Sequence, residues 1–175
     1  MKKEIEHKFL VISDEWRSFI IQSIPIKQAY IYTGPPLAVR VRIEPNKCTL
    51  NLKKAIVATT RDEYEYQIPD EDAEELMKNY ITGYIIEKVR HIVFYKGQRW
   101  EIDEFSGANN GLIVAEIELK NEEEKIIIPP WLGKEVSHDK KYLNTSLALL
   151  PYSKWQKKSH KLNINLHDYK AKKID

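Results

Sequence analysis

Two pairs of glutamates, each with a single residue between its members, have the spacing to bind a divalent metal ion. Glu4 and Glu6 form the first pair, and Glu116 and Glu118 form the second. Residues two apart in a β-strand point to the same face and lie about 7 Å apart along it. Carboxylate oxygens suit Mg²⁺ and Mn²⁺, and Mg²⁺ commonly binds through a few carboxylates together with substrate phosphates. The two pairs therefore predict a Mg²⁺ or Mn²⁺ site built from two strands.

Basic residues with similar spacing suit the oxygens of a polyphosphate. Arg40 and Arg42 lie two apart, and each planar guanidinium group can donate paired hydrogen bonds to phosphate. Single positive charges along a phosphate chain would come from Lys8, Lys53, Lys88 and Arg90. The predicted ligand is a polyanion held by these bases, with a divalent cation held by the carboxylates.

The segments that carry these residues alternate polar side chains with β-branched or aromatic ones, as strands do. The predicted strands are 3–11, 27–33, 38–44, 48–55, 61–68, 85–95, 98–105 and 112–120. Helices are predicted over 13–23, 70–80 and 138–150, from a capping serine, an acidic first turn and the helical spacing of leucines respectively.

One face of the predicted strands carries charges of both signs. On the fifth strand this face holds Glu63 and Glu65, and on the seventh it holds Glu101 and Asp103. For any single strand, the plain interpretation is an antiparallel sheet whose charged face lies in water. The pattern repeats over several strands, however, and eight strands can close into a barrel around one small ligand. We therefore predict an α+β, mainly β fold: an eight-stranded antiparallel closed barrel, or tunnel, with a polar, charged interior and helices packed outside.

Length and composition exclude several classes of protein. The 175 residues carry 28 Lys+Arg and 26 Asp+Glu, and a net charge of +2 argues against a protein that coats nucleic acid. No apolar run approaches the ~20 residues of a spanning helix, and glutamates interrupt the N-terminal segment where a secretory signal would be apolar. We expect a cytoplasmic protein without nucleic-acid or membrane partners, and leave a homodimer open. One domain is predicted over 1–150, followed by a basic C-terminal extension over 151–175.

The order of the motifs resembles that of the triphosphate tunnel metalloenzymes, also called the CYTH domain family. The motifs are EIEHK at 4–8, RVR at 40–42, TLNLK at 49–53, RDEYEY at 61–66, EKVR at 87–90, WEIDEF at 100–105 and AEIEL at 115–119. The resemblance covers about residues 2–150, and the segment after Pro130 looks like the end of the small bacterial members. It implies an eight-stranded tunnel that binds a triphosphate, with metal-dependent attack on the terminal phosphate.

The resemblance also implies a role for each matching residue. The metal-binding carboxylates would be Glu4, Glu6, Glu116 and Glu118, with Asp103 near them. The phosphate-binding bases would be Lys8, Arg40, Arg42, Lys53, Lys88 and Arg90. Tyr30 and Lys88 match a tyrosine–lysine pair beside the reacting phosphate and, with Glu6, form the predicted catalytic set. Glu63, Glu65 and Glu101 would complete the tunnel lining, and Ala29 stands where the family has a glycine.

The predicted activity is metal-dependent hydrolysis of inorganic triphosphate to pyrophosphate and phosphate. The inferred lining offers phosphate and metal ligands but no evident set of groups for a nucleobase. Adenylate cyclase and nucleoside or thiamine triphosphatase activities remain alternatives within the family, because they use the same tunnel. Outside enzymes, the alternatives are a polyphosphate-binding module without turnover, and a sheet protein whose charged face lies in water and which has an interaction role.

Overall fold

The computed structural model describes residues 2–34, 36–57, 60–121 and 123–155, without the side chains of 2–4, 55–57 and 60–62. The described chain forms one antiparallel sheet with a few short helices, which confirms the mainly β, α+β prediction. The strands are β1 (Lys2–Val11), β2 (Ile20–Tyr32), β3 (Leu37–Glu44), β4 (Lys47–Val57), β5 (Thr60–Gln67), β6 (Thr82–Tyr95), β7 (Gln98–Ser106), β8 (Ile113–Leu119) and β9 (Leu132–Glu135). The α-helices are α1 (Asp70–Asn79) and α2 (Asn144–Leu149), and the 3-10 helices are η1 (Glu15–Phe19), η2 (Gly107–Asn109) and η3 (Lys140–Tyr142).

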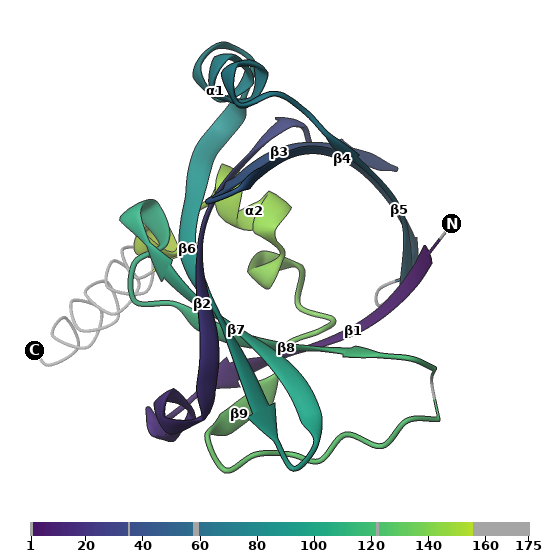
Figure 1. The fold of residues 1–175 in the computed structure, drawn as a ribbon, viewed down its shortest axis with the longest axis vertical. Helices are drawn as coiled ribbons and strands as arrows, with labels where there is room; N and C mark the ends of the chain where they lie inside the picture. Colours follow the sequence, from purple (N-terminus) through teal and green to yellow (C-terminus); the bar gives the residue numbers. More distant parts are fainter. Residues whose placement is uncertain (1, 35, 58–59, 122, 156–175) are drawn as a thin grey trace, which may run out of the picture.

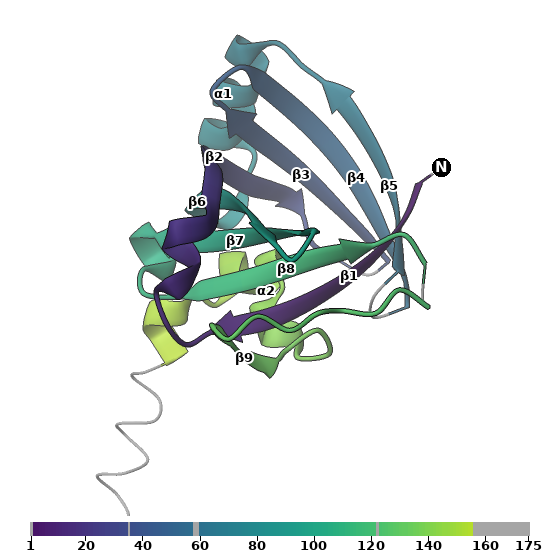
Figure 2. The same ribbon diagram turned by 60° about the horizontal axis from the view of Figure 1, so that its bottom comes forward.

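The strands follow one another around a curved sheet in the order β5-β4-β3-β2-β6-β7-β8-β1-β9. β1 also pairs with β5, from Lys2 opposite Glu63 to Ile5 opposite Thr60. Figure 1 shows this curve from one end, with α1 outside it and α2 visible inside its outline, on the side of β2 and β6. In Figure 2, β3 and β4 face β8 and β1 across the middle of the molecule.

The register of the pairings brings the charged residues of neighbouring strands to one face. Lys8 of β1 lies opposite Glu116 of β8, and Arg90 of β6 lies opposite Asp103 of β7. Directly paired residues point to the same side of a sheet, and so do residues two apart in one strand. The alternating charged positions of these strands therefore share the concave face.

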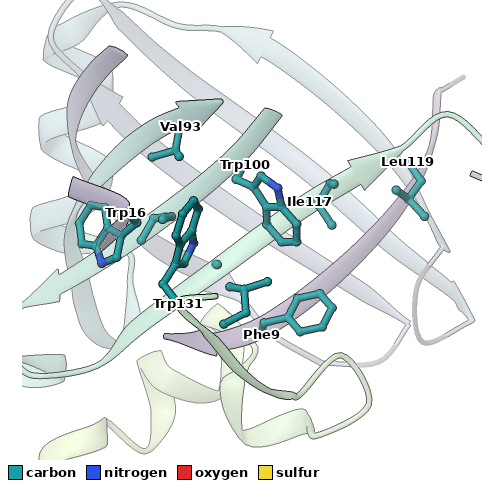
Figure 3. Packing of buried hydrophobic residues seen from close by; sticks show 10 residues of the cluster. Phe9, Trp16, Val93, Trp100, Ile117, Leu119 and Trp131 are labelled. Atoms are coloured by element: carbon teal, nitrogen blue, oxygen red, sulfur yellow. The ribbon is translucent and has the colours of Figure 1, made fainter. Parts of the chain in front are cut away.

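Aromatic side chains form the core on the convex face of β1, β7 and β8. Trp16 comes from η1, Trp100 from β7 and Trp131 from the segment before β9, and all three are fully buried (Figure 3). The ring centroids of Phe9 and Trp100 lie 5.8 Å apart, and those of Tyr95 and Trp131 lie 4.9 Å apart. Because Trp131 is anchored here, the chain after it starts from a fixed position before it returns to the concave face.

A second apolar cluster joins α2 to one end of the curved sheet. Leu147 and Ala148 of α2 pack with Tyr30, Ile86 and other buried residues. Gly83 has φ +81°, and a Cβ there would lie 2.3 Å from the carbonyl oxygen of Ala148. A glycine is therefore needed for α2 to approach β6 this closely.

The structure corrects two of the predicted helices. Within 13–23 the only helix is η1. From Ile20, which lies opposite Val93, the chain is already part of strand β2 and pairs with β6. The range 138–150 divides into η3 and the short α2. The helix predicted over 70–80 is confirmed as α1, whereas β9 has no counterpart among the predicted strands. No helix in the described part of the chain is long and apolar enough to cross a membrane.

The start of the predicted C-terminal extension packs against the domain. Pro151 is buried, and the backbone N–H of Tyr152 donates to Asn109 Oδ1 at 2.9 Å. The ring of Trp155 contacts that of Tyr142 at a centroid distance of 5.3 Å. The rest of the extension, 156–175, lies outside the described residues.

Candidate active site

The concave face lines a cavity of about 660 Å³. Of the residues singled out from the sequence, those that line it are Glu6, Lys8, Tyr30, Arg40, Arg42, Lys53, Glu63, Glu65, Arg90, Glu101, Glu116 and Glu118. Lys88 and Asp103 lie behind this lining, and both side chains are fully buried. The backbone of Glu4 lies in β1, but its side chain is outside the described residues.

An ion-pair network that reaches from the cavity lining into the protein joins β6 to β7 and β8. Asp103 accepts hydrogen bonds from Arg90 Nε and Nη2, each at 2.7 Å, and from Lys88 Nζ. Arg90 Nη2 also donates to Glu116 Oε2 at 2.7 Å, and Arg90 Nη1 donates to Glu101. Asp103 thereby holds the Arg90 guanidinium in a fixed orientation at the edge of the cavity.

Burial and neighbouring charges shift the pKa values of these groups. Burial lowers the pKa of Lys88 to about 8, although Asp103 favours its charged form. Burial opposes ionisation of Asp103 and Glu116 as well, but their basic neighbours prevail and hold both pKa values below the usual range. For Asp103 the main such neighbour is Arg90, and for Glu116 it is Lys8. Both carboxylates therefore stay ionised at neutral pH.

The wall formed by β1 and β8 is rich in carboxylates. Lys8 Nζ lies 2.6 Å from Glu116 Oε1 and 3.6 Å from Glu6 Oε1. Glu6 lies directly opposite Glu118, and Glu116 lies directly opposite Glu101 on β7. Among the described side chains, no group of three or more His, Cys, Asp or Glu is placed so that it could hold a metal ion.

The wall formed by β3, β4 and β5 presents bases held by acidic partners. Glu63 accepts from Arg40 Nη2 at 3.4 Å and lies 2.9 Å from Lys53 Nζ. The side-chain amide of Asn51 donates to Glu63 at 2.9 Å and to Glu65 at 2.7 Å. Asn51, which the sequence analysis did not select, thus fixes Glu63, which contacts both bases, together with the neighbouring Glu65.

Gln28 is a second residue that the sequence analysis missed. Its side chain is fully buried, and its Oε1 accepts from Arg42 Nε at 3.2 Å and Nη2 at 2.9 Å. Its Nε2 is 3.5 Å from the hydroxyl of Tyr30, which lines the cavity. One signal was present: Gln28 precedes Tyr30 by two positions and so shares its face.

The chain after β9 also lines the cavity, through Ser137, His138, Lys140, Leu143, Asn144 and Thr145. Ser137 Oγ accepts from the backbone N–H of Lys8 at 2.9 Å and donates to Glu135 at 2.7 Å. These bonds fix the segment to β1 beside a predicted phosphate-binding residue. The sequence analysis found a family resemblance in the segment after Pro130 but selected no site residue there, because its position depends on β9 and Trp131.

Comparison with known proteins places the chain in a family. Residues 2–148 match the CYTH domain model, so the chain belongs to the CYTH domain family, as the order of the motifs predicted. An inorganic triphosphatase of Acetivibrio thermocellus is 39% identical over 156 residues, which cover 89% of this chain and 99% of that protein. An inorganic triphosphatase of Nitrosomonas europaea is 34% identical over 150 residues, covering 83% and 97% respectively.

One solved structure is similar to this chain in both fold and sequence. The crystal structure of the inorganic triphosphatase NE1496 matches with a TM-score of 0.66 and 33% identity, covering 85% of this chain and 96% of that one. This likeness extends over nearly the whole of the solved protein, so the curved sheet and its helices are a shared architecture.

The buried carboxylates predict a loss of stability in acid. The pKa of Glu116 is held well below 4.5 in the folded protein, so the unfolded chain takes up a proton first as the pH falls. The free energy of unfolding should therefore decrease below about pH 4.5. Urea denaturation between about pH 3 and pH 6 should show a shallower decline for Glu116→Gln than for the unmodified protein. Equal slopes would contradict the ion pairs assigned to Glu116.

Proposed function

We propose that this chain hydrolyses inorganic triphosphate to pyrophosphate and phosphate in the cavity on the concave face. The observation that carries the proposal is that bases and carboxylates line the cavity together, with bases on both of its walls. Arg40, Arg42 and Lys53 lie on β3 and β4, opposite the carboxylates of β1 and β8. Such a site suits a highly charged anion accompanied by a cation. The inorganic triphosphatases at 39% and 34% identity support the same substrate.

We also propose that the sheet closes as an eight-stranded barrel, with β9 added outside it. The pairing of β1 with both β8 and β5 supports closure, because it joins the two ends of the strand order. In a closed barrel the ligand is surrounded by the charged faces of all eight strands. Charges placed there are stabilised by each other and by the ligand rather than by bulk water.

Mg²⁺ or Mn²⁺ is the proposed cofactor, held by Glu6, Glu116 and Glu118, with Glu4 as a further ligand. Glu6 lies directly opposite Glu118, and like charges in that position destabilise a sheet unless a cation lies between them, so carboxylate oxygens here suit a hard cation. The described side chains are not gathered around one point, so the ion would have to draw the carboxylates together. The ion would neutralise phosphate oxygens and lower the pKa of a bound water. Asp103 was also predicted as a ligand. Its position in the ion-pair network favours a role in orienting Arg90 instead.

The residues of the chain would orient the triphosphate and stabilise the charge that develops on it. Arg40, Arg42 and Lys53 would bind the phosphate chain, while Lys8 and Arg90 would approach it from the other side of the cavity. Water would attack the terminal phosphorus in line as the bond to the bridging oxygen breaks, and pyrophosphate would leave. Tyr30 lines the cavity, where its hydroxyl would donate a hydrogen bond to a phosphate oxygen. Lys88 is buried and would act on the site through its hydrogen bond to Asp103.

Phosphate release from inorganic triphosphate, ATP and thiamine triphosphate, each with Mg²⁺, Mn²⁺ or EDTA, tests the proposal. We expect metal-dependent release that is fastest from inorganic triphosphate. Faster phosphate release from ATP or thiamine triphosphate would reassign the substrate. Formation of cyclic AMP and pyrophosphate from ATP would indicate a cyclase. A rise in melting temperature with triphosphate but no turnover would indicate a binding module. The absence of both binding and turnover would contradict the proposed site.

A further inference from the structure

The structure assigns to Gln28 the role of a positioning residue for Arg42. We infer that its amide is a neutral clamp: it holds the guanidinium in place and leaves the positive charge of that group available to the phosphate chain. This inference rests on the proposed function and deepens it. It concerns how the site obtains its affinity for a polyanion.

The geometry of the pair is specific. Gln28 of β2 lies directly opposite Arg42 of β3, and Gln28 Oε1 accepts from two nitrogens of the guanidinium. A guanidinium group only donates hydrogen bonds, so the amide must turn its oxygen toward Arg42 and its nitrogen toward Tyr30. One amide thus fixes a cation and a hydroxyl that both line the cavity.

The shortest contacts of Arg42 differ from those of the other bases that line the cavity. Lys8, Arg40, Lys53 and Arg90 each form an ion pair with a carboxylate inside the site. Within the described residues, the hydrogen bonds of Arg42 go to the neutral amide of Gln28, and its ion pair with Glu44 is a longer contact, at 3.5 Å from Nη1. Burial, together with Arg40 and Arg90, lowers the pKa of Arg42 to about 10.

A buried cation that is repelled by other cations gains most from an incoming anion. A carboxylate at position 28 would hold Arg42 equally well, but it would cancel the charge that attracts the phosphate chain. An apolar residue would keep the charge but leave the guanidinium donors without their acceptor. A neutral acceptor is the side chain that meets both requirements.

Two variants of nearly equal size separate these effects. Gln28→Leu removes the acceptor, and Gln28→Glu keeps it but adds a negative charge. Binding of tripolyphosphate in EDTA, measured by calorimetry, should weaken about 10- to 100-fold in Gln28→Leu, as expected for lost hydrogen bonds to a charged group. Gln28→Glu should weaken it at least as much. KM should rise more than kcat falls, because Arg42 holds substrate and transition state alike.

A double-mutant cycle tests whether Gln28 acts through Arg42. Adding Gln28→Leu to Arg42→Ala should cause little further loss of affinity, because the group that Gln28 positions is already absent. Thr49→Val is the matched control: Thr49 is buried opposite Arg42 in the register, and its hydroxyl donates to Asn51. The Thr49→Val protein should bind tripolyphosphate more tightly than the Gln28→Leu protein does.

Several outcomes would overturn the inference. A Gln28→Leu protein that is less stable but binds tripolyphosphate as tightly as the unmodified protein would show a merely structural role. Additive losses in the cycle would show that Gln28 does not act through Arg42, and unweakened binding by Gln28→Glu would refute the need for neutrality. Failure of the proposed hydrolysis looks different. If the unmodified protein binds tripolyphosphate without turnover, the binding cycle still decides the role of Gln28; if it does not bind tripolyphosphate at all, the site and this role of Gln28 are both refuted.

Discussion

Replacing Glu6 with Gln should abolish most metal-dependent hydrolysis of triphosphate while leaving the fold and the binding of the anion largely intact. Glu6 lines the cavity and faces Glu118 across the β1–β8 pairing. Changes to residues that merely support a metal ligand typically cost 10- to 100-fold, so the loss of a direct ligand should reduce kcat/KM by about 100-fold or more. Steady-state phosphate release over a range of Mg²⁺ concentrations measures this loss.

The fold should survive this change because Lys8 keeps its 2.6 Å contact with Glu116 when its longer contact with Glu6 is lost. Removing one negative charge beside the anion should leave tripolyphosphate binding in EDTA unchanged or slightly tighter. Added Mg²⁺ should restore part of the activity, since a weakened site fills at higher ion concentration. Glu87→Gln makes the same charge change on the other face of β6, where Glu87 lies 3.8 Å from Lys27, and should behave as the unmodified protein. Full activity in Glu6→Gln would refute the metal assignment.

The face on which the charged residues lie follows from the sequence because strand alternation is a local property. Arg40 and Arg42 must share a side of β3, and hydrogen-bonded pairing then extends that face to the neighbouring strands. Alternation does not show how deeply each side chain on that face is buried. Lys88 and Arg90 share a side of β6, yet the side chain of Lys88 is fully buried and Arg90 reaches the cavity. Which of the two meets the ligand depends on sheet curvature and on Asp103 from β7.

Other parts of the site depend on contacts between distant segments and leave no local signal. Ser137 lines the cavity because Trp131 is buried in the aromatic core and β9 pairs with β1. The range 13–23 was predicted as a helix because its capping serine is a strong local cue. Pairing of Ile20 with Val93 outweighs that preference, since a strand there adds hydrogen bonds and buries apolar surface along β6. Tertiary pairing therefore decides the start of β2.

The largest effect on stability is expected from Arg90→Met, which removes the centre of the buried ion-pair network. Arg90 contacts Asp103, Glu116 and Glu101, and its removal leaves these carboxylates with less compensating charge. Removing one partner of a buried ion pair typically costs about 3–5 kcal/mol, because the remaining charge is left desolvated. Urea denaturation at neutral pH should therefore show a free energy of unfolding lower by about this amount.

Arg99→Met is the matched control, because Arg99 contacts the same Glu101, at 2.6 Å, but its side chain is half exposed. An exposed ion pair is worth about 0–1 kcal/mol, so this variant should lose little stability. The difference in the free energy of unfolding between Arg90→Met and the unmodified protein should also become smaller in acid. Arg90 is the main group that holds the pKa of Asp103 below 3.8, so the unmodified protein alone loses that contribution as the carboxyl is protonated. Equal losses of stability in Arg90→Met and Arg99→Met would mean that Arg90 stabilises the fold no more than a surface charge does, and that its ion-pair network does not hold the site in place.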